Sequence, residues 1–401
     1  MSVLCHITST VLVLLTALGA TGPLVGAAPA PFTLVGGRVL QRDGTLKEGL
    51  AIVVAGQRIQ RVAKAGENLP NPLHLSPTSV ISPGIIDVCS SVGAHGAVIE
   101  ISKPVNSTAS AADAVDAFHR DLVTAARAGI TTAMVCPLPN AVVSGTAVTF
   151  RTAVDKSKLD PLDILRRDGP VVFALGEQVL RRDREPTSRS GAVTLLERAL
   201  VAATRGEDHP GLSLFLEGSV PGVVFCSELQ DVHRALDIFA TAGRVPHVVF
   251  TPEQPLSTVK ALAERLKALP GSFAIVGPLD FRSSHNALAS GAAFDRAGVP
   301  VVFAGGLPLY SRYSPRVAAA LAVRHGMEPA AARRALTSAA AAVAGVSERI
   351  GSLEVGKDAD IVVFSDDPLR LDARIEYVYG RGKPLFKSQP KPAQRRRYAE
   401  R

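Results

Sequence analysis

The feature that most constrains this chain is a long alternation of short apolar runs and alanine-rich stretches between residues 80 and 344. The apolar runs have strand length and the alanine-rich stretches have helix length, so the pattern predicts repeated β-α units. The predicted strands cover residues 80–88, 131–136, 171–175, 222–226, 247–251, 272–277 and 299–304. The predicted helices cover residues 111–128, 192–204, 229–242, 256–268, 287–297, 315–326 and 329–344.

This alternation is typical of a closed (β/α)8 barrel, in which eight parallel strands are each followed by a helix. A hydrophobic fraction of 47% supplies enough apolar surface for a large core. The alternative fold is a doubly wound open sheet. The sequence contains no G-x-G-x-x-G after a predicted strand, so nothing favours a dinucleotide-binding version of that fold.

Both ends of the chain have a different texture from the middle. Residues 32–40 and 50–54 read as short strands near the N-terminus, and residues 360–364, 375–379 and 384–386 read as strands near the C-terminus. We expect the two ends to fold together into one small β-sandwich. The predicted organisation is a signal peptide at 1–30, sandwich strands at 31–80, a barrel at 81–345, more sandwich at 346–386 and a basic tail at 387–401.

The N-terminus resembles an export signal. Residues 10–20 (TVLVLLTALGA) form an apolar stretch of suitable length, and small residues from Ala27 to Ala30 provide cleavage positions. The run is too short to span a bilayer comfortably, although an uncleaved anchor is the alternative. We therefore expect a periplasmic or extracellular protein. Three cysteines remain after cleavage, an odd number that leaves at least one free thiol or an intermolecular bond.

The formal net charge of the chain is +8, and part of this excess lies in the tail at 387–401. Such a tail could contact anionic surfaces, but a solvated end is the plainer interpretation. The sequence contains no recognised nucleic-acid module. The sequence does not identify a partner, whether a small molecule or a protein, and it does not indicate an oligomeric state.

Several short segments resemble one enzyme superfamily. Residues 81–87 (ISPGIID) resemble the opening of the first barrel strand of the amidohydrolase superfamily, and residues 351–362 (GSLEVGKDADIV) resemble the return of its chain to a β-domain. The pieces GITT (129–132), FALGE (173–177) and AGVPV (297–301) resemble the imidazolonepropionase-like branch. Their order and spacing agree from residue 32 to residue 386, so the resemblance implies a (β/α)8 TIM-like barrel with a small β-sandwich domain.

In active members, the resemblance implies a divalent metal held by an H-x-H pair on strand 1, one His each on strands 5 and 6, and an Asp on strand 8. Such a metal makes its bound water acidic, and the Asp shuttles a proton. Here the corresponding positions hold Cys89, Ser91, Phe225, Thr251 and Gly306. A register shift of one residue would substitute Cys226 for Phe225 or Phe250 for Thr251. None of these side chains is an imidazole or a carboxylate, so the sequence predicts that the standard metal site has been lost and that no cofactor is bound.

Other side chains could still perform chemistry at the barrel mouth. Cys89, Cys136 and Cys226 end predicted strands and could bind metal or act as nucleophiles, or could simply be small buried residues. A disulfide between Cys89 and Cys136 would need Cα atoms within ~7 Å.

Two histidines and one carboxylate complete the candidates. His95 and His285 follow strands 1 and 7, and Glu177 follows strand 4. Each could face the mouth as an acid-base group or lie on the surface.

The sequence supports three functional hypotheses. The leading one is an exported, metal-free pseudoenzyme that keeps the amidohydrolase scaffold for structure or binding. The alternative is a hydrolase acting on non-peptide carbon-nitrogen bonds, of the cyclic amide or imidazolone type, with a rearranged site or with zinc or another divalent metal. The third is an interaction protein that binds through its basic tail.

Overall fold

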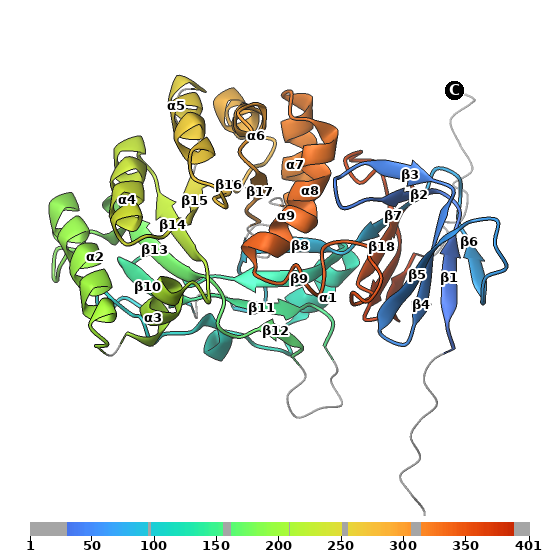
Figure 1. Ribbon diagram of the computed structural model, residues 1–401, viewed down its shortest axis with the longest axis horizontal. Helices are drawn as coiled ribbons and strands as arrows, with labels where there is room; N and C mark the ends of the chain where they lie inside the picture. Colours follow the sequence, from blue (N-terminus) through green and yellow to red (C-terminus); the bar gives the residue numbers. More distant parts are fainter. Residues whose placement is uncertain are drawn as a thin grey trace, which may run out of the picture.

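The computed structural model describes residues 30–94, 98–154, 162–207, 209–250, 256–305 and 314–388. Within these ranges no helix is both long enough and apolar enough to cross a membrane. The predicted signal peptide, apart from Ala30, and residues 389–401 of the predicted basic tail lie outside them. Figure 1 shows two bodies side by side, a small β-domain and a larger mixed domain.

Both ends of the described chain contribute strands to the small β-domain. One sheet has the strand order β5-β4-β1-β6 and the other has the order β20-β19-β18-β7-β2-β3. Buried side chains from both sheets, including Leu34, Ile52, Ile81 and Ile361, form their shared core. The strands are β1 (Phe32–Val35), β2 (Arg38–Leu40), β3 (Leu46–Glu48), β4 (Leu50–Ala55), β5 (Arg58–Lys64), β6 (Pro72–His74), β7 (Val80–Pro83), β18 (Ile361–Phe364), β19 (Ile375–Gly380) and β20 (Lys383–Lys387).

The prediction of one strand over residues 80–88 is wrong, because Gly84 divides it. Strand β7 pairs with β18 in the sandwich, whereas β8 (Ile85–Ser90) pairs with β9 (Ile130–Val135) in the larger domain. A Cβ atom on Gly84 would lie only 1.8 Å from Oγ1 of Thr131. The chain therefore crosses between the domains at a point that has room only for glycine.

The larger domain is a barrel built mainly from parallel strands. Strands β13, β14, β15, β16 and β17 pair in parallel in sequence order, and β8 pairs in parallel with β9. A bridge between Val88 and Ala304 joins β8 to the end of β17, which an open doubly wound sheet would not have. The new strands are β13 (Val171–Leu175), β14 (Gly222–Cys226), β15 (His247–Phe250), β16 (Ala274–Val276) and β17 (Val301–Phe303).

The third position of the ring departs from the predicted pattern. It is occupied by β10 (Val143–Thr146) and β11 (Val148–Arg151), which follow one another across Ala147. Strand β11 is antiparallel to β9, and β10 is antiparallel to β13. A third short strand, β12 (Ile164–Arg166), pairs with β11 outside the ring. The predicted TIM-like barrel is confirmed, but one of the eight strand positions in the described chain runs in the opposite direction.

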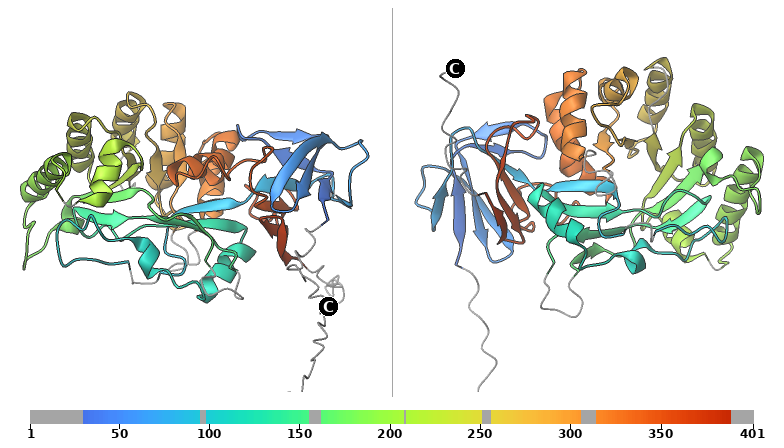
Figure 2. Two further views of the ribbon diagram at one scale, coloured as in Figure 1. Left: turned by 60° about the horizontal axis from the view of Figure 1, so that its bottom comes forward. Right: turned by 180° about the vertical axis from the view of Figure 1, so that it is seen from behind.

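Most of the described helices stand in a row along one side of the strands, whereas β10, β11 and β12 lie on the other side (Figures 1 and 2). The predicted helix over 111–128 is a 3-10 turn, η1 (Ala111–Ala114), and a shorter helix, α1 (Arg120–Arg127). The predicted helix over 329–344 is broken at Thr337 into α8 (Pro329–Leu336) and α9 (Ser338–Val343). The other helices are α2 (Arg189–Thr204), α3 (Pro210–Glu217), α4 (Leu229–Thr241), α5 (Leu256–Lys267), α6 (His285–Arg296), α7 (Pro315–Arg324) and η2 (Glu177–Val179).

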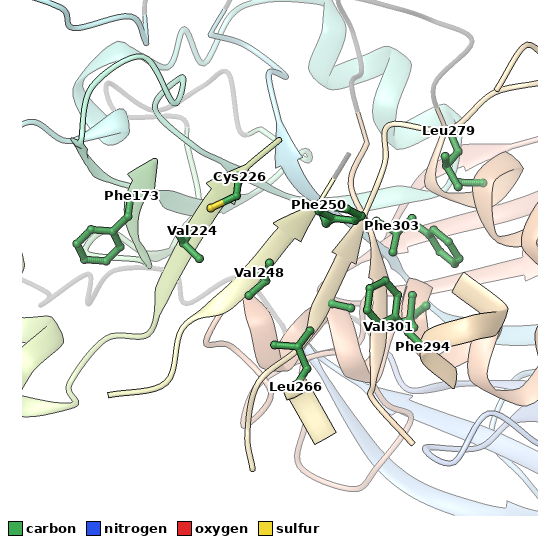
Figure 3. Packing of buried hydrophobic residues seen from close by; sticks show 14 of the residues in the cluster. Phe173, Val224, Cys226, Val248, Phe250, Leu266, Leu279, Phe294, Val301 and Phe303 are labelled. Atoms are coloured by element: carbon green, nitrogen blue, oxygen red, sulfur yellow. The ribbon is translucent and has the colours of Figure 1, made fainter. Parts of the chain in front are cut away.

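Alternate residues of the barrel strands form two separate apolar cores. The outward-facing side chains pack against the helices; Figure 3 shows this layer through residues such as Phe173, Val224 and Val248. The inward-facing side chains fill the barrel interior together with residues of α9. The interior strand residues are Ile86, Val88, Met134, Val172, Val223, Val249, Ile275 and Val302.

A buried ion cluster joins the barrel to the sandwich. Arg151, on β11, is 1% exposed and reaches three carboxylates. Its Nε lies 2.8 Å from Asp360, its Nη1 lies 2.9 Å from Asp163 and its Nη2 lies 2.6 Å from Asp358. Burial alone would lower the pKa of Arg151, but the three carboxylates raise it, so the guanidinium stays charged. Asp358 and Asp360 precede β18, so this single side chain crosses the domain boundary.

We predict that Arg151→Met lowers the free energy of unfolding by about 3–5 kcal/mol, because it leaves buried carboxylates without their cation. The matched control is Arg61→Met, which removes an exposed ion pair with Glu67 and should cost no more than about 1 kcal/mol. Urea unfolding followed by circular dichroism measures both. Equal losses in the two variants would contradict the importance given to the cluster.

Candidate functional site at the barrel mouth

The parallel strands of the barrel all point their carboxyl ends at one rim, which we call the mouth. In barrels of this architecture, residues at these strand ends and in the following loops carry the chemistry. The last residues of β8, β9, β13 and β14 lie in the described chain, so the side chains at this part of the mouth can be placed.

Cys89 and Cys136 meet at the mouth. The thiol of Cys136 donates to Sγ of Cys89 over a distance of 3.9 Å. Cys136 is buried and Cys89 is half-buried, and both are free thiols. The hydrogen bond with Cys136 and then burial raise the pKa of the Cys89 thiol well above its usual range, so Cys89 is held as a neutral thiol. A neutral thiol is a weak nucleophile and a weak metal ligand.

Asp87 lies fully buried beside this pair. A Cβ atom on Gly305 would come within 1.7 Å of Oδ1 of Asp87, so the carboxyl group occupies the space that a side chain at residue 305 would need. The Ser90 side chain and the Gly305 N–H approach it, but neither contact has full hydrogen-bond geometry. Burial dominates and raises the pKa of Asp87 to about 7. The carboxyl group is therefore a poorly solvated acid.

Phe225 and Cys226 face opposite sides of strand β14. Phe225 packs against the barrel interior, and Cys226 packs into the outer core under the helices, where Figure 3 shows it beside Val224. The expectation that Cys226 approaches the mouth with Cys89 and Cys136 is therefore wrong, because alternate strand residues point in opposite directions. Burial raises the pKa of the Cys226 thiol, which keeps it protonated.

Glu177 does not point into the barrel. Its side chain is 80% exposed, and Oε1 lies 3.4 Å from Nη2 of Arg189. Its neighbour Gln178, which was not among the predicted site residues, bridges the ends of β13 and β14 instead. Nε2 of Gln178 donates to the carbonyl oxygen of Leu175 at 2.8 Å and to that of Phe225 at 3.1 Å. The available signal was a polar residue within three positions of the end of a barrel strand.

Only one of the two candidate histidines, His285, lies in the described chain. His285 is the exposed first residue of α6, and its ring centroid lies 5.4 Å from that of His325, which caps α7. His95 lies outside the described residues, as do Thr251 and Gly306. Whether His95 and His285 meet stays a prediction.

The residues at the mouth do not fit the metal that the resemblance implies. Within the described ranges, no three His, Cys, Asp or Glu side chains are grouped so that they could hold an ion. The two positions outside those ranges carry threonine and glycine, which bring neither imidazole nor carboxylate. Phe225 puts an aromatic ring where a strand-5 ligand would project.

The buried carboxyl group of Asp87 predicts a specific pH dependence. The pKa of Asp87 rises from 3.8 to about 7 on folding, so between these pH values its carboxyl group is ionised only in the unfolded chain. Stability should therefore fall as pH rises from about 4 to about 7 and then level off. Asp87→Asn removes this loss. The difference in free energy of unfolding between the variant and wild type should therefore be larger at pH 8 than at pH 4, in favour of the variant. The increase should reach at most ~4 kcal/mol, which corresponds to a difference of about 3 pKa units.

Urea unfolding at several pH values checks this prediction, and the exposed Asp113→Asn variant controls for the loss of one carboxylate. A gain of the same size in both variants would mean that burial of Asp87 is not its cause.

Comparison with known sequences gives two partial matches. A model of the amidohydrolase family matches residues 311–386. An imidazolonepropionase from Thermoplasma volcanium is 31% identical over 136 residues, which is 33% of this chain and 31% of that protein. The matched region thus spans about a third of the length of this curated relative.

Comparison with solved structures covers far more of the chain. An amidohydrolase from Thermotoga maritima matches with a TM-score of 0.76 and 21% identity, over 89% of this chain and all of the other. A putative prolidase from Bifidobacterium longum matches with a TM-score of 0.53 and 18% identity, over 90% of this chain and 96% of the other. At these identities the structural matches establish a shared fold.

The family model covers the return from the barrel to the sandwich, and the matches to solved structures extend over most of the chain. These findings agree with the resemblance carried by the motifs at 81–87 and 351–362. Taken together, the family-model match, the partial imidazolonepropionase match and the shared fold support the assignment of this chain to the amidohydrolase superfamily, on its imidazolonepropionase-like branch.

Proposed function

We propose that this protein is an exported amidohydrolase-like pseudoenzyme, which keeps the fold as a scaffold or binding domain and lacks metal-dependent hydrolysis. The observation that carries the proposal is the donor set. The positions equivalent to the family's metal ligands hold Cys89, Ser91, Phe225, Thr251 and Gly306. Divalent metals in hydrolases need several converging imidazole or carboxylate donors, and this set supplies none.

The state of the remaining groups supports the same proposal. Cys89 is held as a neutral thiol, Cys226 faces the outer core and Glu177 is paired at the surface. None of these arrangements resembles an activated nucleophile with an adjacent base. The described side chains that fill the barrel interior below the mouth are apolar, and they provide no hydrogen-bond donors for a transition-state charge.

One observation favours a second candidate function. Asp87, Cys89 and Cys136 gather at the mouth, and a carboxyl group with a pKa near 7 could exchange protons at neutral pH. A hydrolase acting on non-peptide carbon-nitrogen bonds of cyclic amides or imidazolones could be built around such a cluster. The neutral thiol of Cys89 weighs against it as a nucleophile.

Metal analysis and turnover assays separate the two candidates. We predict well under one divalent metal per chain after purification with added zinc, and no chelator-sensitive turnover of amides, lactams, cyclic imides or imidazolones. Stoichiometric zinc whose removal abolishes turnover would contradict the pseudoenzyme proposal. Metal-independent turnover that Cys89→Ala abolishes and Cys226→Ala retains would favour the rearranged hydrolase.

Export is tested separately. We predict that the protein recovered from outside the cytoplasm begins between Ala27 and Pro31, because small residues precede this point and the first described strand, β1, begins at Phe32. N-terminal sequencing of the protein from culture medium, periplasm and cytoplasm provides the measurement. The full-length chain found in the cytoplasm alone would contradict export, and the full-length chain found in membranes would indicate an uncleaved anchor.

A further inference from the structure

The thiol pair at the mouth has a geometry that neither the fold nor the proposed function requires. Cys89 lies near the end of β8 and Cys136 directly follows β9, so the two sulfurs meet across neighbouring parallel strands. Their separation of 3.9 Å is a hydrogen-bond contact between thiols, about 2 Å longer than a disulfide bond. A modest movement of one strand end would close that gap.

Strand β8 provides the freedom for this movement. The pairing of β8 with β9 shifts register between Asp87 and Ser90, so the backbone at Cys89 lies outside the regular ladder. Cys89 has a φ of 53°, in the left-handed region that side-chain-bearing residues seldom adopt. Adjusting this residue breaks no ladder pairing, because the register shift has already removed it from the ladder.

Exposure differs between the two thiols in a useful way. Cys89 is half-buried at the rim, whereas Cys136 is 6% exposed. A small disulfide compound can therefore reach Cys89 but hardly Cys136. The less accessible thiol already lies against the accessible one, which is the arrangement of an attacking cysteine and a resolving cysteine.

We infer that Cys89 and Cys136 form a site of reversible oxidation, which closes to an intramolecular disulfide linking β8 to β9 at the barrel mouth. The oxidant is a small-molecule disulfide such as oxidised glutathione. At alkaline pH the fraction of Cys89 that has lost its proton attacks one sulfur of the oxidant, and one small thiol leaves. Cys136 then attacks the Cys89 sulfur of the mixed disulfide, and the second small thiol leaves. Two electrons pass to the oxidant, and both protons end on the released thiols.

The bond would have a mechanical effect on the chain. Cys89 and Cys136 are 47 positions apart, and the segment between them contains η1 and α1. Closing this loop covalently restricts the unfolded chain and fixes the two strand ends at the rim. Oxidation should therefore raise the midpoint of thermal unfolding, and a reductant should restore the original value.

The experiment uses the full-length reduced protein, incubated with excess oxidised glutathione at about pH 9.5, above the ordinary pKa of a thiol, because the raised pKa of Cys89 leaves little thiolate at lower pH. Trapping with an alkylating agent in denaturant, followed by non-reducing peptide mapping, identifies the state of each cysteine. We expect the loss of two of the four thiols of the chain, one peptide pair linked through Cys89 and Cys136, and reversal by dithiothreitol.

Two variants make the result specific. Cys226→Ser removes a buried thiol that faces the outer core, and should leave the linked pair and the rise in melting temperature unchanged. Cys136→Ser should abolish both and instead accumulate glutathione on Cys89. Wild-type protein that ends with glutathione on Cys89, or that forms the bond only after denaturation, would overturn the inference.

Discussion

The contact on which the two-domain arrangement depends is the cluster around Arg151. One guanidinium on a barrel strand holds Asp358 and Asp360, which immediately precede the sandwich strand β18. Gly84 crosses the same boundary in the other direction, against Thr131. A charge buried to this depth is tolerated only when its partners are held in place. The ion cluster at Arg151 and the close contact at Gly84 therefore hold the barrel strands β11 and β9 against the sandwich.

The barrel mouth beside this joint has an unusual set of side chains. In the described part of the barrel, the interior positions are largely apolar or aromatic, and the polar groups at the mouth include the thiols of Cys89 and Cys136 and the poorly solvated carboxyl group of Asp87. Burial is the largest influence on the pKa of Asp87, whereas the hydrogen bond with Cys136 is the largest influence on the pKa of Cys89. Hydrolysis by metal-bound water needs a different arrangement, in which several donor side chains share one cation. The pseudoenzyme proposed above would keep the scaffold without this chemistry.

The fold could be predicted from sequence because its signals are local and repeated. Strand-helix alternation and the segments 81–87 and 351–362 indicated the barrel and the composite sandwich. The antiparallel strand formed by β10 and β11 escaped prediction, since its direction depends on pairing with β9 and β13 rather than on its own pattern. The sequence left open whether Cys89 and Cys136 are in contact, because the distance between two strand ends depends on the register of the strands. The outward direction of Cys226 and the surface position of Glu177 are also consequences of register and side-chain packing.

The reversed strand also determines where the rim can be remodelled. In a barrel with uniform strand direction, each loop that follows a strand opens onto the same face. At this position the connection before Val143, which includes Asn140, lies on the mouth side; Nη2 of Arg181, from the turn after β13, donates to the carbonyl oxygen of Asn140 at 2.9 Å. The strand ends at Arg151 on the opposite face, beside the sandwich. At this strand position, sequence changes in the connection before Val143 would therefore reshape the opening of the barrel, whereas changes at the Arg151 end would alter the interdomain joint.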